Sequence, residues 1–166
     1  MAVATRRALV LTTLFAGAAW AQTGAPSNAE GLRVLYGLAE LQRRASTLAA
    51  SRDTRPEVKS FATDMAAWRE MQVPRLRDFL TGRGIAAPEM SEDQRAVWEA
   101  LEPLDFLALS RRFAEIEVQA LELEIAGYER ATTTGDQSLV GLANETLPSL
   151  RRLLDSARRA YDAVKP

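Results

Sequence analysis

The sequence predicts an all-α protein whose long helices form an antiparallel four-helix bundle with short extra helices. Apolar residues recur every three or four positions over long stretches, which places them on one face of a helix, and no stretch shows the alternation typical of a strand. The chain has 166 residues, of which 47% are hydrophobic and 26% are charged, as expected for one soluble domain.

The N-terminal segment has the three parts of a secretory signal peptide. Arg6 and Arg7 precede an apolar run that is too short to span a bilayer, and Ala19 and Ala21 form an A-x-A cleavage site. We therefore predict that residues 1–21 are removed and that the protein is exported, to the periplasm or the medium. The route is the general secretory (Sec) pathway or, as a second option indicated by the paired arginines, the twin-arginine pathway. An uncleaved membrane anchor is the alternative.

The mature chain is predicted to begin with a flexible lead at residues 22–28, followed by one bundle domain at residues 29–166. The first helix is expected over residues 29–51, with Asn28 as its N-cap. Its predicted apolar face consists of Val34, Leu38, Leu41, Ala45 and Leu48.

A second helix is expected to begin with Pro56 in its first turn and to end at Gly82. Its predicted apolar face consists of Val58, Phe61, Met65, Trp68, Leu76 and Phe79. Pro74 lies inside this helix and predicts a kink, because proline removes a backbone hydrogen bond.

The next segments predict a short helix and then the longest one. Ser91 and Gln94 have the spacing of a capping box, which indicates a helix over residues 91–101. A long apolar stripe then predicts a helix over residues 105–133.

After a turn at Gly135, we expect a short helical segment at residues 137–145. Pro148 is then predicted to open a separate last helix over residues 147–164. Four main helices with short or partly helical connections bury their apolar faces most economically as an antiparallel bundle.

The residue types exclude much catalytic and metal chemistry. The chain has no histidine and no cysteine, so thiolate nucleophiles, zinc fingers, histidine-held haem and Ser-His-Asp triads cannot form. Loss of Arg6 and Arg7 with the signal changes the formal net charge from −1 to −3, a balance that disfavours nucleic-acid binding. We assign no catalytic and no cofactor-binding residues, and we expect neither an enzymatic activity nor a cofactor.

Three charged residues interrupt the separation of apolar and polar faces. At about 100° per residue, Glu117 and Glu124 fall on the apolar arc of the long helix, and Arg69 falls on that of the second helix. A buried charge without a partner is too costly to expect. These side chains therefore predict either a compensating partner or access of water.

Three interpretations of these charges are open. In the first, Arg69 forms a buried ion pair with Glu117 or Glu124 and sets the register of two helices. In the second, Glu117 and Glu124 bind a metal ion or small ligand in the core, and oxygen ligands favour iron, manganese, calcium or magnesium. Residues seven apart lie about 10.5 Å apart along a helix, which disfavours joint ligation of one ion. In the third, both glutamates are half-exposed at a loose seam.

Four sequence elements together resemble one known family. They are Val58-x-x-Phe61-Ala62-x-x-Met65, the helix from Phe113 to Tyr128, Gly135-Asp136 and Leu147-Pro148-x-Leu150. In this order they resemble the exported bacterial family called domain of unknown function 4142, over residues 32–160. The resemblance implies a ferritin-like four-helix bundle behind a signal sequence, an envelope location and no established reaction.

Members of that family often carry histidines at three places along the helices. The matching residues here are Arg69, Leu121 and Leu153. If relatives use those histidines to bind a metal or cofactor, this chain lacks the ligands, and the resemblance therefore weighs against the metal interpretation. It also suggests that an ion pair at Arg69 takes the place of an older polar centre.

Together these observations predict an exported, non-catalytic helical-bundle module of the bacterial envelope with a binding or structural role. The alternative is a ferritin-like protein that binds a metal, iron or manganese, or a small ligand through core carboxylates. The expected partner is an envelope protein or a second copy of the chain, with the short helix around Trp98 as the contact surface. We expect no nucleic-acid partner and no transmembrane span after signal cleavage.

Overall fold

The computed structural model describes residues 27–166. The predicted signal peptide, residues 1–21, and all but the last two residues of the predicted lead lie outside the described residues. Over residues 27–166 the structure is helical and contains no strand, which confirms the predicted all-α fold class.

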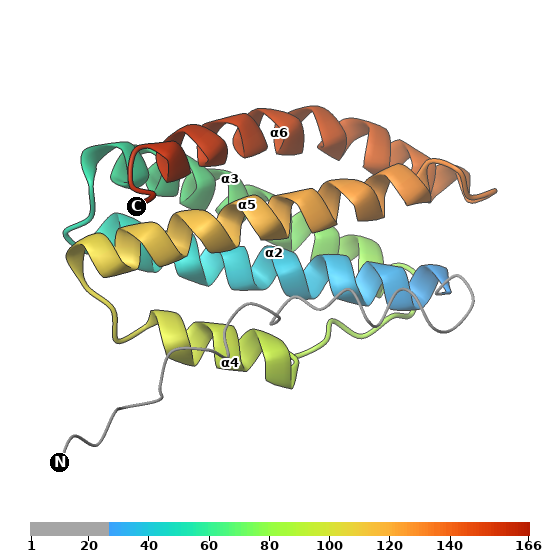
Figure 1. Cartoon of the computed structure of the whole chain (residues 1–166). Coiled ribbons are helices and arrows are strands. Elements are labelled where there is room, and N and C mark those ends of the chain that lie inside the picture. The colour runs from blue at the N-terminus through green and yellow to red at the C-terminus, as the bar shows by residue number, and fades with distance from the viewer. Residues whose placement is uncertain (1–26) are drawn as a thin grey trace, which may run out of the picture.

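Four long helices and one short helix make up the described part of the chain. They are α2 (Asn28–Ser51), α3 (Pro56–Thr81), α4 (Glu92–Leu101), α5 (Phe106–Ala131) and α6 (Gln137–Asp162). The long helices share one general direction, and α4 lies along the outside of them (Figure 1).

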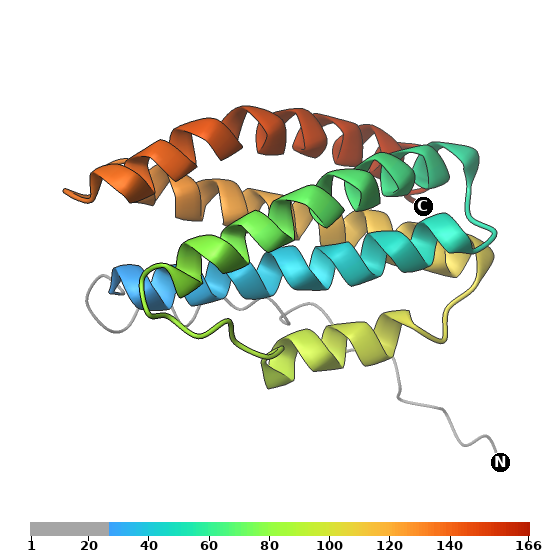
Figure 2. The same ribbon diagram turned by 180° about the vertical axis from the view of Figure 1, so that it is seen from behind.

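The four long helices form two antiparallel hairpins. α2 packs on α3, α5 packs on α6, and the hairpins join through contacts of α2 with α5 and of α3 with α6. As a result α3 and α5 stand diagonally opposite each other. The link between the hairpins runs back along the bundle and contains α4, which rests on α2 and touches α5, as Figure 2 also shows. One long crossover of this kind is the connectivity of ferritin-like bundles.

Two predicted helix starts match the structure, and one is displaced by a residue. Pro56 occupies the first turn of α3, and Ser91 and Gln94 form the predicted capping box of α4. At α2, however, Ser27 rather than Asn28 is the N-cap, because its hydroxyl accepts a hydrogen bond of 3.2 Å from an amide in the first turn.

The predicted break before Pro148 is wrong, because α6 is one continuous helix from Gln137 to Asp162. Proline removes the hydrogen bond to the carbonyl four residues earlier, which here belongs to Asn144. Both Asn144 and Pro148 lie on the exposed side of the helix, where water can solvate that carbonyl. The buried stripe on the other side continues past this point through Leu139, Ala143, Leu147 and Leu150. α3 likewise continues through the exposed Pro74.

Glycine permits a close helix contact in the apolar core. A Cβ atom on Gly127 of α5 would lie 2.8 Å from Cδ2 of Leu35 on α2, well inside normal packing distance. α2 buries a broad face, because α3, α4 and α5 all pack on it.

None of the described helices combines the length and the apolar character needed to cross a membrane.

Candidate functional site

Five polar side chains lie together in the interior of the bundle. Gln42 comes from α2, Arg69 from α3, and Glu117, Glu124 and Tyr128 from α5. Each residue is completely buried, with 0% of its surface exposed. We call this set the core network. It contains the three charged residues placed on apolar arcs by the sequence, together with two further polar residues.

Arg69 and Glu124 form a buried, two-pronged ion pair. Nη1 of Arg69 donates to Oε1 of Glu124 at 3.1 Å, and Nη2 donates to Oε2. Nη1 also donates to Oε1 of Gln72 at 2.9 Å, and the guanidinium carbon lies 4.6 Å from the centre of the Trp68 ring. Paired charge-assisted hydrogen bonds of this kind are among the strongest in proteins. Each charge therefore compensates the burial of the other.

Glu117 is connected to the guanidinium through Gln42. Nη2 of Arg69 donates to Oε1 of Gln42, and Nε2 of Gln42 donates to Oε2 of Glu117 at 3.1 Å. The side-chain amide of Gln42 thus accepts a hydrogen bond from Arg69 and donates one to Glu117. Through these contacts the network joins three helices, α2, α3 and α5.

The two glutamates differ in their electrostatic surroundings. Burial raises the pKa of Glu117 from 4.5 to about 8; the charge of Arg69 and the hydrogen bond from Gln42 oppose this effect, and the negative charge of Glu124 adds to it. At pH 7 the Glu117 carboxyl group is therefore mainly protonated. The core network then holds one cation and one anion and has no net charge. Burial also raises the pKa of the Tyr128 hydroxyl.

Three buried polar atoms of the core network lack a hydrogen-bond partner among the described residues. They are Nε of Arg69, Oε1 of Glu117 and the hydroxyl oxygen of Tyr128. The hydroxyl lies near Thr146 and Gln72 without a well-formed bond to either. Each unpaired buried group costs on the order of 1–3 kcal/mol. The network is thus balanced in charge but incomplete in hydrogen bonding.

The core network does not have the arrangement of a metal centre. Within residues 27–166, no three acidic side chains converge on a common point. Both oxygens of Glu124 are bonded to Arg69, so a metal ion would have to displace a cation from that carboxylate. The arrangement suits charge compensation between helices better than metal ligation.

Gln42 is the residue that sequence reasoning missed, because the predicted apolar face of the first helix was wrongly centred. Val34 and Leu48, which were assigned to that face, are only partly buried. Leu38, Leu41 and Ala45 are buried as predicted, and the buried face extends on one side through Leu35, Ala39, Gln42, Ser46 and Ala49. Gln42 is two helical turns from both Leu35 and Ala49, and this spacing is the signal that could have identified it.

A protein-family model matches this chain. The family described as Domain of unknown function (DUF4142) matches residues 15–160, which is most of the chain. No curated protein and no solved structure matches the chain. The chain therefore belongs to the DUF4142 family.

Proposed function

We propose that this protein is an exported, non-catalytic helical-bundle module of the bacterial envelope, with a binding or structural role. The absence of a catalytic role is inferred from the burial and mutual bonding of the side chains in the core network. Its charged groups are completely buried and engage each other, since Arg69 bonds to Glu124 and to Gln42. A catalytic group needs to face a substrate, whereas these groups face one another.

The sequence of the first residues supports export. Arg6 and Arg7, the apolar run and the Ala19-x-Ala21 site have the order of a cleaved secretory signal. Small residues at the first and third positions before the cut are what the signal peptidase requires. Cleavage after Ala21 would leave a mature chain that begins at Gln22.

Fractionation of producing cells tests the export part, with N-terminal sequencing of the protein in each fraction. We expect the protein in the periplasm or the medium, with Gln22 as its first residue. Ala21→Leu should leave the precursor uncut, whereas the matched variant Ala18→Leu, inside the apolar run, should still be processed. A protein that begins at Met1 in the membrane fraction would overturn the proposal.

Metal analysis tests the alternative, in which core carboxylates bind iron or manganese. We expect protein purified from its native compartment to hold less than stoichiometric metal. Stoichiometric iron or manganese that is lost in a folded Glu117→Gln, Glu124→Gln double variant would establish the alternative. The control is Glu115→Gln with Glu122→Gln, because these residues have the same spacing on α5 and lie at or near its surface.

A further inference from the structure

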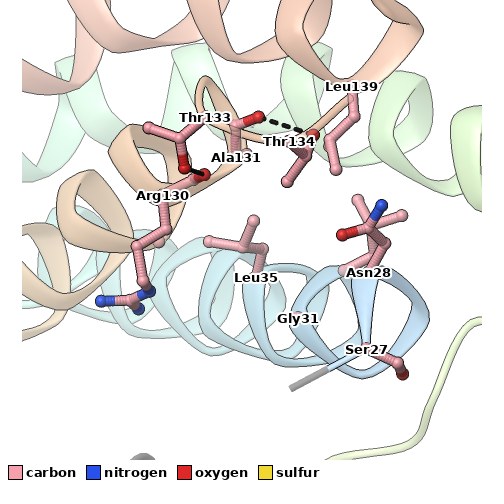
Figure 3. A pocket seen from close by; sticks show the side chains of 11 residues that line it. Ser27, Asn28, Gly31, Leu35, Arg130, Ala131, Thr133, Thr134 and Leu139 are labelled. Carbon is pink, nitrogen blue, oxygen red and sulfur yellow. Dashed lines mark hydrogen bonds between the residues drawn. The ribbon is translucent and has the colours of Figure 1, made fainter. Parts of the chain in front are cut away.

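A pocket of about 240 Å³ lies at one end of the bundle, between the start of α2, the end of α5 and the start of α6 (Figure 3). Its apolar wall includes Leu32, Leu35, Ala131 and Leu139, and its polar edge includes Asn28 and Thr134. Apolar atoms make up most of the exposed lining, although five of the eleven lining residues are polar: Ser27, Asn28, Arg130, Thr133 and Thr134. This is the usual composition of a small-molecule site.

Two glycines in the lining shape this pocket. A Cβ atom on Gly31 would meet nothing within 4 Å, so the absence of a side chain on this turn of α2 leaves open space. At Gly127, by contrast, a Cβ atom would clash with Leu35. The close approach of α2 and α5 there holds Leu35 in place as part of the wall. The pocket thus has a firm apolar wall next to a helix turn without a side chain.

Apart from Arg130, the polar side chains that line the pocket are neutral. Figure 3 shows the amide of Asn28 directed toward Leu139 across the open space, while the guanidinium of Arg130 points away from it. The hydroxyl of Thr134 donates to the Ala131 carbonyl at 2.9 Å, so its oxygen can still accept a hydrogen bond. An amide that donates and accepts and a hydroxyl that accepts favour an uncharged ligand group.

We propose that this pocket binds a small uncharged molecule made of one apolar ring or short chain and a single hydrogen-bonding group such as a hydroxyl. The size supports this class of ligand. An apolar cavity of about 150 Å³ accommodates benzene, so the larger volume here leaves room for a ring with small substituents. The ring lies against the leucines, and the hydroxyl faces Asn28 and Thr134. The site goes beyond the proposed function and does not depend on export.

Amide NMR of the protein as isolated from producing cells tests this site, with p-cresol as the probe. We expect saturable shifts confined to the first turns of α2, the end of α5 and the start of α6. Gly31→Leu should weaken p-cresol binding about tenfold or more, because the leucine fills the pocket. The matched control is Gly141→Leu on α6, where a Cβ atom also meets nothing within 4 Å and where binding should change less than about twofold.

Two results would overturn the proposed binding site. The first is the absence of saturable shifts with p-cresol. The second is equal binding to Gly31→Leu and to the wild-type chain. If the first result comes together with perturbed resonances of residues 22–26 in Gly31→Leu, the preceding segment takes this space. Each result is independent of where the protein resides in the cell, so failure of the site and failure of the proposed function are distinguishable.

Discussion

Arg69 of α3 and Glu124 of α5 are joined through the centre of the bundle although their helices stand diagonally opposite each other. Neighbouring helices are held together by apolar packing. The diagonal pair is instead connected by side chains that cross the core, with Gln42 of α2 bonded to the same guanidinium. Because Arg69, Glu124 and Gln42 are completely buried, loss of one of these side chains leaves a bonded partner without compensation.

Removal of the cation should be strongly destabilising. Arg69→Met is expected to lower the free energy of unfolding by about 3–5 kcal/mol, because the Glu124 carboxylate would remain buried without a partner. Adding Glu124→Gln should recover a substantial part of this loss. Urea unfolding at pH 7 measures each variant, and purely additive effects of the two substitutions would contradict a direct pair.

The Arg69→Met variant can also test which of the two glutamates Arg69 compensates. Glu117→Gln added to Arg69→Met should recover less than Glu124→Gln does, since Glu117 is mainly protonated at pH 7 with its pKa raised to about 8. Equal recovery by the two substitutions would show that Arg69 compensates both carboxyl groups alike.

Stability should decrease with rising pH because of Glu117. The folded state retains a proton on this group that the unfolded chain releases, since the pKa is about 8 in the fold against 4.5 without burial. The free energy of unfolding therefore falls as the pH rises from 4.5 to about 8, by an amount on the order of 3–5 kcal/mol. Glu117→Gln should remove this decrease.

Urea unfolding at several pH values checks this dependence. The control is Glu122→Gln, which removes a surface carboxylate from the same helix and should leave the decrease in place. A wild-type chain and a Glu117→Gln variant with parallel pH profiles would rule out a protonated Glu117.

The bridging amide should affect both stability and pH response. Gln42→Leu removes an acceptor from Arg69 and a donor from Glu117, and should cost about 1–3 kcal/mol. Because the hydrogen bond from Gln42 lowers the pKa of Glu117, its loss should raise that pKa further. The decrease in the free energy of unfolding with rising pH would then extend to a higher pH. The control is Gln119→Leu, on the polar side of α5, which should leave the pH profile of stability unchanged. An unchanged pH profile in Gln42→Leu would contradict the hydrogen-bonded bridge from Arg69 to Glu117.

The close contact between α2 and α5 predicts opposite effects at two glycines. Gly127→Ala should destabilise by about 1–3 kcal/mol, because the new methyl group would lie 2.8 Å from Leu35. Gly141→Ala, where nothing lies within 4 Å, should stabilise by up to about 1 kcal/mol through helix propensity. Thermal unfolding measures both, and a stabilising Gly127→Ala would mean that Leu35 yields readily.

Most of the helix pattern could be predicted because its signals are local. The periodicity of apolar residues, the proline that opens α3 and the Ser91–Gln94 capping box act within a few residues of themselves. The error at Pro148 arose where local preference is weaker than packing. A buried stripe on the far side of α6 outweighed the cost of one missing hydrogen bond.

The presence of buried charge was also readable in the chain, since Arg69, Glu117 and Glu124 each fall on an apolar arc. The sequence could not show which glutamate pairs with the arginine, because the two glutamates lie on one face of the same helix, two turns apart. The stagger of α3 against α5 decides it, and that stagger results from contacts between residues distant in sequence. The same long-range packing brings Gln42 into the core, since three neighbouring helices cover α2. It also places three helix ends and a turn around the pocket at Gly31.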